Sequence, residues 1–166
     1  MKSGVNMINC IEIIFGKTYN SNSMLFKILD LFKMEVEIYR IASGDLSAYL
    51  CDSKYTSLFE KNTYTYIELY EKQHHPFEID SGTILAFPTK DTVDICTEDQ
   101  LIQSKCIYGI SIVDYNEYYF FSVKQDIIVK IESLCSKTAD IKYRIGNLKN
   151  MNILQMYTPI INNNHK

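Results

Sequence analysis

The sequence predicts an α+β domain in which a mainly antiparallel β-sheet carries two or three helices packed on one face. Many short segments alternate apolar and polar residues with the period of two that half-buried strands show. Short polar turns join several of these segments, as is typical of antiparallel hairpins. Because the sequence has neither a Gly-rich phosphate loop nor a regular alternation of strands and helices, a doubly wound parallel sheet is not expected.

The length and composition fit one globular domain. The chain has 166 residues, of which 46% are hydrophobic and 22% are charged. These proportions are close to the average of folded domains, and a chain of this length can bury a packed core. We expect a single domain over residues 1–161, followed by a short disordered tail over residues 162–166.

The N-terminal quarter of the chain is expected to form two strands with a helix between them. Residues 7–15 are mostly apolar, and residues 34–41 alternate apolar with polar or aromatic side chains. Asn22 or Ser23 is available as the N-cap of the helix. The apolar face of this helix, spaced by three and four residues, comprises Leu25, Ile28, Leu29 and Phe32.

The central part of the chain has less regular patterns. Residues 43–61 favour two short helical turns separated by Asp52-Ser53. Residues 63–71 are rich in alternating β-branched and aromatic side chains, so we expect a strand there. His74-His75-Pro76 indicates a turn. Shorter strands are expected over residues 77–79, 82–87 and 92–96.

The clearest pattern is a hairpin in the second half of the chain. Residues 106–113 and 118–124 are the predicted strands, and the polar residues 114–117 between them suit a tight connection. Upstream of the hairpin, Thr97 and Gln100 match a capping box, which predicts a brief helix.

The segment after the hairpin is expected to form the strongest helix. Residues 125–137 have apolar side chains at helical spacing and lysine near the C-terminal end, so they predict an amphipathic helix. Residues 141–145 alternate as a strand, and Gly146-Asn147 indicates a turn. Residues 151–157 are expected to form a last strand.

Cysteine usage indicates the compartment. Five cysteines occur at wide spacing without any Cys-x-x-Cys pair. This pattern matches neither a disulfide framework nor a zinc site. Free cysteines indicate a reducing environment, so we expect a cytoplasmic protein. We expect no membrane association, because no apolar run approaches the roughly 18 residues that a spanning helix requires.

Charge is distributed unevenly along the chain. Residues 68–99 contain eight acidic residues against two lysines, whereas residues 124–166 contain seven basic residues against three acidic ones. The acidic stretch could steer a basic protein partner toward this region. It could equally be a solvated face that keeps the protein in solution. Because the net charge is −3, nucleic acid is not the expected ligand.

The tyrosines of the predicted strand over residues 63–71 lead into the acidic stretch. On a strand, Tyr64, Tyr66 and Tyr70 would share one face with Glu68. Tyrosine is enriched at protein interfaces, although an aromatic ladder between strands explains the pattern as well. We therefore hypothesise a non-enzymatic protein-binding module, of the inhibitor or immunity kind, that engages a basic partner. Its expected binding residues are Tyr64, Tyr66, Glu68, Tyr70, Glu71, Asp91, Asp94 and Glu98.

Two other hypotheses stay open. One is a small hydrolase or transferase with its site near residues 71–96, because a cysteine nucleophile needs a neighbouring base. The other is a subunit that acts by forming homo-oligomers through its tyrosine face. We expect neither a metal nor a cofactor, since adjacent histidines on a strand point to opposite faces. The candidate nucleophiles and bases are Cys51, Cys96, Cys106, His74 and His75.

Overall fold

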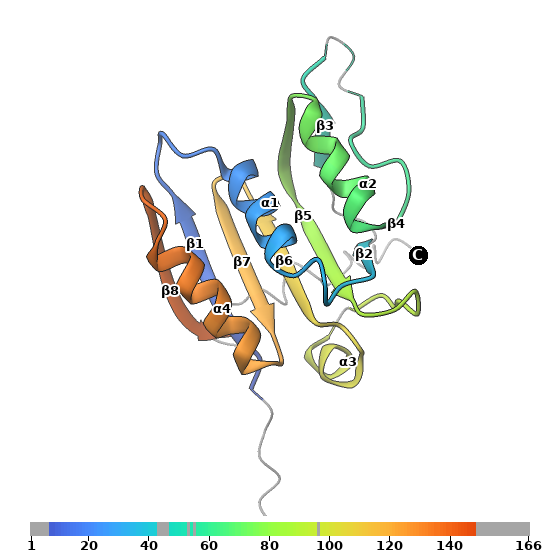
Figure 1. Cartoon of the computed structure of the whole chain (residues 1–166), viewed down its shortest axis with the longest axis vertical. Coiled ribbons are helices and arrows are strands. Elements are labelled where there is room, and N and C mark those ends of the chain that lie inside the picture. The colour runs from blue at the N-terminus through green and yellow to red at the C-terminus, as the bar shows by residue number, and fades with distance from the viewer. Residues whose placement is uncertain (1–6, 43–46, 53, 55, 96, 149–166) are drawn as a thin grey trace, which may run out of the picture.

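The computed structural model describes residues 7–42, 47–52, 54, 56–95 and 97–148. In this part of the chain, eight antiparallel strands form a sheet in the order β4-β2-β5-β6-β7-β1-β8, and β3 extends it by pairing with β5 (Figure 1). The predicted α+β class with a mainly antiparallel sheet is confirmed. The strands are β1 (Asn9–Phe15), β2 (Ile38–Ile41), β3 (Ser47–Leu50), β4 (Thr63–Tyr64), β5 (Phe77–Phe87), β6 (Tyr108–Val113), β7 (Glu117–Ser122) and β8 (Ile141–Asn147).

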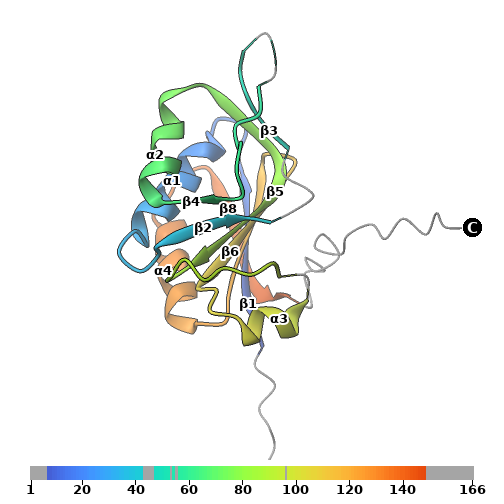
Figure 2. The ribbon, with the colours of Figure 1, turned by 90° about the vertical axis from the view of Figure 1, so that its right-hand side faces the viewer.

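Helices cover both faces of the sheet unequally. Figure 2 shows α1, α2 and α4 on one face, as the sequence predicts, while the short α3 lies toward the other. Within the described residues, no helix is both long enough and apolar enough to span a membrane. The helices are α1 (Ser21–Leu31), α2 (Tyr66–Glu71), the 3₁₀ turn η1 (Lys72–His74), α3 (Glu98–Gln103) and α4 (Gln125–Ser136).

Helix α1 forms where its apolar spacing predicts, but its N-cap is Asn20, two residues before Asn22 and three before Ser23. The side chain of Asn20 accepts a hydrogen bond from the Asn22 backbone N–H at 3.0 Å. Asn22 does not cap the helix, because its own side chain donates to the carbonyl of Phe77 at 3.0 Å. This bond ties the start of α1 to the start of β5.

The hairpin and α4 follow the sequence prediction closely. Strands β6 and β7 pair from Gly109 opposite Phe121 to Val113 opposite Glu117. Helix α4 packs on β1 and β7, and Thr97 and Gln100 form the expected capping box of α3. The buried face of α4 consists of Ile127, Ile128, Ile131 and Cys135.

Two clusters of buried side chains lie on opposite faces of the sheet. The larger one joins α1, α2 and α4 to the sheet and includes a contact chain of Phe32, Tyr108 and Phe120, with ring centroids 4.9 and 5.0 Å apart. The smaller one includes Leu101 of α3 and Phe121 of β7. Because central strands are covered on both faces, their residues are mostly buried and do not alternate.

Two predicted elements of the first half are wrong in part, because β2 begins only at Ile38 and residues 47–50 are not helical. Residues 47–50 form β3 in place of a helical turn, because their backbone pairs with β5. Residues 34–37 precede β2 as a turn, in which the N–H groups of Glu35 and Val36 donate to the carbonyl of Phe32 at 3.0 and 3.2 Å. In both places, backbone hydrogen bonds determine the conformation, to β5 for residues 47–50 and to Phe32 for residues 34–37. The local side-chain pattern, which suggests another conformation, is the weaker influence.

Other differences concern strand ends. Strand β5 runs unbroken from Phe77 to Phe87, and Gly82 within it has φ 140°, a conformation that favours glycine. Strand β8 continues through Gly146-Asn147, which pair with β1 and do not turn the chain. Residues 92–95 form no strand. Cys96, the predicted strand over residues 151–157 and the predicted tail over residues 162–166 lie outside the described residues.

Candidate functional site

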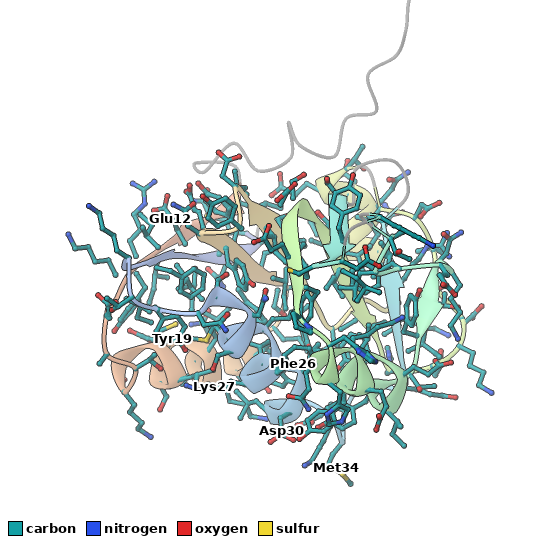
Figure 3. All side chains as sticks on the ribbon, turned by 90° about the horizontal axis from the view of Figure 1, so that it is seen from above. Glu12, Tyr19, Phe26, Lys27, Asp30 and Met34 are labelled. Atoms are coloured by element: carbon teal, nitrogen blue, oxygen red, sulfur yellow. The ribbon has the colours of Figure 1, made fainter. Side chains whose placement is uncertain are left out.

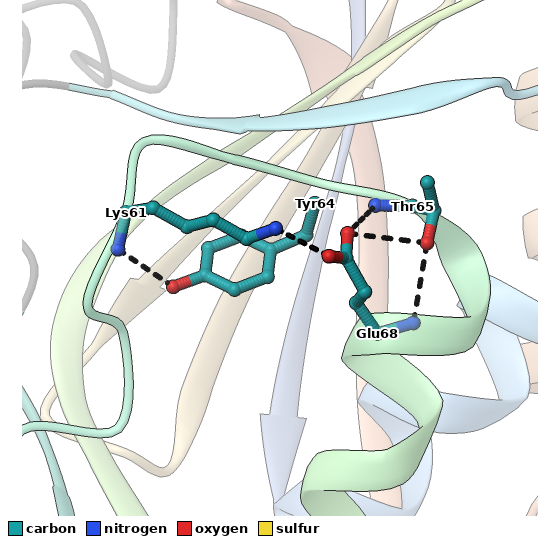
Figure 4. A network of polar contacts seen from close by, with 4 residues as sticks. All are labelled: Lys61, Tyr64, Thr65 and Glu68. Carbon is teal, nitrogen blue, oxygen red and sulfur yellow. Dashed lines mark hydrogen bonds and ion pairs between the residues drawn. The ribbon is translucent and has the colours of Figure 1, made fainter.

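The segment with the three predicted tyrosines forms strand β4 and helix α2, so the predicted strand over residues 63–71 is wrong. The Thr65 hydroxyl accepts from the Glu68 N–H at 3.3 Å, and the Glu68 carboxylate accepts from the Thr65 N–H at 2.7 Å (Figure 4). This reciprocal pair is a capping box, which fixes the start of a helix. The Thr-x-x-Glu spacing was present in the sequence, but the aromatic alternation concealed it.

The helix brings two of the tyrosines together and separates the third. The rings of Tyr66 and Tyr70, four residues apart on α2, have centroids 5.4 Å apart. Tyr70 also meets Phe26 of α1 edge to face at 6.4 Å, and Phe26 meets Phe77 of β5 at 5.9 Å. Tyr64 is only 2% exposed and belongs to the core. The exposed aromatic surface is therefore smaller than predicted and is shared by α1 and α2.

Glu68 is occupied by contacts within its own fold. Its carboxylate accepts from the Lys61 ammonium and from Thr65 (Figure 4). The hydrogen bond from Lys61, followed by that from the Thr65 backbone, lowers the pKa of Glu68 to about 2. Lys61 also lies over the Tyr64 ring at 5.1 Å. These contacts stabilise the start of α2 and leave Glu68 a poor candidate for binding a partner.

Three other predicted carboxylates also have basic neighbours. The guanidinium Nε of Arg40 on β2 lies 2.8 Å from Asp94, whereas Lys105 lies 3.6 Å from Asp91. Glu71 lies 3.6 Å from His74 Nε2. The fold therefore supplies much of the positive charge that the sequence lacks between residues 68 and 99. The last predicted residue, Glu98, lies in the first turn of α3, where a carboxylate favours the helix dipole.

A large groove lies between the start of α1 and the segment that joins α2 to β5. Its volume is about 1120 Å³. Figure 3 shows Tyr19, Phe26, Lys27 and Asp30 following one another along α1 and the turn before it, and all four line the groove. The opposite wall includes Gln73, His74, His75, Pro76, Phe77 and Glu78. Much of this rim is exposed, so the groove is open along its length.

Three carboxylates lie at or beside the β5 end of the groove. Glu78 lines the groove, whereas Asp80 follows it on the strand face opposite the buried Phe77 and Ile79 and is not among the lining residues. The Asp80 carboxylate accepts from the Ser47 hydroxyl at 3.5 Å. The backbone N–H of Tyr115 donates to the carbonyl of Asp80 at 2.9 Å, which places the β6–β7 turn with Asp114 beside them. Within the described part of the chain, Glu78, Asp80 and Asp114 form no salt bridge. Glu78 lines the groove and the other two lie beside it, and we call the three residues together the acidic end of the groove.

Only some of the residues proposed for an enzyme site lie close together in the fold. Cys51 is exposed and lines the groove with His74 and His75, because its N–H donates to the Pro76 carbonyl at 2.9 Å. The 3.6 Å between His74 and Glu71 is longer than a hydrogen bond. Cys106 is buried, and burial raises the pKa of its thiol to about 12. Across the described residues, no group of three or more His, Cys, Asp or Glu side chains could hold a metal ion.

A buried carboxylate on the other face of the sheet escaped the sequence analysis. Glu12 of β1 is 6% exposed and accepts hydrogen bonds from Arg144 of β8 and from the Tyr119 hydroxyl of β7, the latter at 3.2 Å. The same hydroxyl also lies within hydrogen-bond distance of the Glu117 carboxylate, so the two carboxylates share its one proton as acceptors. Burial raises the pKa of the Tyr119 hydroxyl. The signal available in the sequence was a glutamate inside an apolar strand, which suggests a buried carboxylate with polar partners. The contacts of Glu12 connect β1 to β7 and β8.

Sequence reasoning missed several aromatic residues of the groove. Tyr19 comes from the turn before α1, Phe26 from α1 and Tyr115 from the hairpin turn, so only the folded chain brings them near Glu78. Glu78 was visible as part of the acidic stretch. The chain matches no known family model, no curated protein and no solved structure, so any functional proposal depends on this groove and its surroundings.

Proposed function

We propose that this protein is a non-enzymatic protein-binding module, of the inhibitor or immunity kind, that engages a basic partner through the groove. The observation that carries the proposal is an open, aromatic-lined groove with three carboxylates at or beside one end, none of which forms a salt bridge with the residues that the structure describes. Of the residues expected from the sequence, Tyr70 lines the groove and Tyr66 packs against Tyr70. Glu78, Asp80 and Asp114 replace those that the fold already neutralises.

The size of the groove favours a chain segment over a small molecule. Sites for small ligands have volumes of roughly 300–1,000 Å³ and enclose most of the ligand. This groove, at about 1120 Å³, has exposed residues along its rim. Tyrosine side chains contribute large contact area with few rotatable bonds, which suits a protein interface. An extended segment of a partner could lie along α1 with its side chains between Tyr19 and Tyr70.

The charge of the groove favours a cationic segment. An unpaired surface carboxylate attracts a basic group without first losing an internal ion pair, whereas a paired one must exchange partners. Complementary charge also speeds association and discriminates against acidic proteins. Lys27 is held over the Tyr19 ring at 5.7 Å, on the α1 side of the groove. The acidic end is therefore the point where the partner's basic residues are expected.

Titration with a defined cationic probe tests this proposal. An acetylated and amidated hexa-lysine peptide is added at low ionic strength to the nitrogen-15-labelled full-length protein, and backbone amide shifts are followed by NMR. We expect the largest shift changes at residues 77–80 and 114–115, with reversal at high salt because exposed charges are screened. The absence of shift changes, or changes centred on residues 91–94, would contradict the proposal.

Thiol chemistry is a second candidate function, favoured by the presence of Cys51, His74 and His75 on one groove. A histidine base would increase the thiolate fraction of Cys51 and hence its reactivity. Alkylation of Cys51 by iodoacetamide near pH 6.5 is the test, with glutathione as the reference thiol. A rate well above that of glutathione that falls in His74→Ala or His75→Ala would support this candidate. A rate close to that of glutathione would exclude it.

A further inference from the structure

We infer that the outer edge of strand β8 is a second docking surface, which binds an extended, acidic segment of a partner protein as an additional antiparallel strand. Figure 1 shows β8 at the end of the sheet that is opposite β4. Among the described strands, β8 pairs with β1 alone. An edge strand of this kind is a template for pairing with another chain. The inference goes beyond the proposed function, because it concerns a surface that is separate from the groove.

Half of the backbone groups of β8 point away from β1. The Leu148 N–H donates to the Ile8 carbonyl at 2.9 Å, and the Gly16 N–H donates to the Asp140 carbonyl at 2.8 Å. In an antiparallel pair, hydrogen-bonded residues alternate with residues whose backbone groups point outward. No described segment forms a backbone hydrogen bond with the first three of the outward residues. These outward residues are Ile141, Tyr143, Ile145 and Asn147.

The side chains of this edge are apolar on one face and basic on the other. Tyr143 and Ile145 pair with core residues of β1 and lie on the face that carries α4, yet they are 37% and 47% exposed. Lys142 and Arg144 lie on the opposite face and are also exposed. Arg144 is paired with Glu12, whereas Lys142 forms no salt bridge with the described residues. A segment that alternates apolar and acidic residues would match both faces at once.

Charge disfavours a second copy of this chain as the occupant of the edge. In an antiparallel pair of two β8 strands, a register with Tyr143 opposite Tyr143 places Lys142 opposite Arg144. A register with Tyr143 opposite Ile145 places Arg144 opposite Arg144. Like charges directly opposite each other on neighbouring strands are destabilising. Acidic residues at the same positions would form oppositely charged pairs, so we assign the edge to an acidic partner.

Hydrogen exchange on the full-length protein tests the edge directly. The probe is an acetylated and amidated heptapeptide of alternating valine and glutamate that begins and ends with valine. In the free protein, the outward N–H groups of Tyr143 and Ile145 should be less protected than the β1-bonded N–H groups of Lys142 and Arg144. With most of the protein bound, exchange at Tyr143 and Ile145 should slow about tenfold. The absence of slowing at these two amides would overturn the inference.

Methylated probes separate backbone pairing from charge attraction. In an antiparallel strand added to β8, the valine amides point toward Tyr143 and Ile145, and the glutamate amides point away. Methylation of the valine amide nitrogens should therefore lower the affinity about tenfold, and methylation of the glutamate amide nitrogens should change it by less than about twofold. Any other pattern would overturn the inference. This comparison uses only the wild-type protein, so it does not depend on the folding of a variant.

Variants of β8 test the two kinds of contact. Ile145→Pro removes an outward N–H, which an edge strand tolerates, and it should abolish binding of the unmethylated probe. Lys142→Glu should weaken binding about fivefold. The control is Lys90→Glu, which changes the net charge equally at an exposed position after β5 and should have less than about a twofold effect. Binding by Ile145→Pro, or equal losses in the two lysine variants, would overturn the inference.

Sedimentation velocity shows whether a second copy occupies the edge instead. We expect the wild type to remain a monomer at the concentrations used for binding. A wild-type dimer that dissociates in Ile145→Pro would assign the edge to a second copy and overturn the acidic partner. The groove and β8 share no residue. Failure of hexa-lysine to bind the groove would therefore contradict the proposed function and leave this inference in place.

Discussion

Two groups of carboxylates in the same acidic region have different surroundings. Glu68 and Asp94 are held by Lys61 and Arg40, which come from other parts of the chain. Glu78 and Asp80 on β5 form no salt bridge with the described residues, and with Asp114 they make up the acidic end of the groove. The difference shows that negative charge counted along a sequence includes carboxylates that the fold already pairs with basic groups. Under the proposed function, we expect the unpaired carboxylates to mark the binding surface.

Replacing Arg144 shows how much a carboxylate depends on its basic partner. The carboxylate in this case is the buried Glu12. Arg144→Met would leave Glu12, which is 6% exposed, without its cation. An unpaired buried carboxylate is strongly unfavourable, so we expect the melting temperature to fall by about 5 °C. Lys142→Met is the matched control, because Lys142 lies two residues away on the same face of β8. Similar losses in both variants would show that the Glu12 contact does not matter.

The capping box of α2 gives the next largest effect. Thr65→Ala removes the side-chain acceptor for the Glu68 N–H, and the loss of an N-cap costs about 1 kcal/mol in the free energy of unfolding. Urea denaturation followed by circular dichroism measures the change. Ser23→Ala in α1 is the control, since Asn20 caps that helix. A full effect from Ser23→Ala with none from Thr65→Ala would contradict the assigned caps.

The pH dependence of stability follows from Glu68. Its folded pKa, about 2, lies below its ordinary value of 4.5, so its stabilising contribution is complete above pH 4.5 and is lost as the pH falls toward 2. The side chain is 42% exposed, so we expect only about 0.5 kcal/mol at neutral pH. The difference in unfolding free energy between wild type and Glu68→Gln should shrink across this range. Lys61→Met should remove the same pH-dependent component, and a constant difference would contradict the assignment.

The smallest effect on stability is expected at the acidic end of the groove. Among the residues that the structure describes, Glu78, Asp80 and Asp114 form no salt bridge, and the one long hydrogen bond from Ser47 to Asp80 can also be accepted by an asparagine side chain. The combined variant Glu78→Gln, Asp80→Asn and Asp114→Asn should therefore unfold within about 0.5 kcal/mol of the wild type, which is the usual range for surface substitutions. Urea denaturation checks this expectation. A clear destabilisation would mean that these carboxylates serve the fold and not a partner.

Local patterns predicted the fold where they agreed with long-range pairing. The hairpin of β6 and β7 and the helix α4 have strong periodicity and form where the sequence predicts. Residues 63–71 are the opposite case, because their alternation of tyrosines suits a strand while their Thr-x-x-Glu spacing suits a helix start. The helix forms because Thr65 and Glu68 make the capping contacts and because Leu69 is buried in the core.

The groove could not be predicted from the sequence, for a different reason. Its walls come from α1, from the end of α2 and from β5, with Tyr115 added from a distant hairpin turn. The pairing of Arg40 with Asp94 likewise joins residues 54 positions apart. Neither the groove nor this ion pair produces a recognisable pattern among neighbouring residues of the sequence. The acidic stretch was visible in the sequence, but the sequence could not separate its paired carboxylates from its unpaired ones.

The most direct test of the central claim compares two neutralised variants for binding to hexa-lysine. One carries Glu78→Gln, Asp80→Asn and Asp114→Asn, and the other removes four paired carboxylates through Glu68→Gln, Glu71→Gln, Asp91→Asn and Asp94→Asn. We expect the first to lose affinity about tenfold and the second to stay within about twofold, although the second loses more charge. A larger loss in the second variant, or losses in proportion to net charge, would contradict the claim that unpaired carboxylates mark the binding surface.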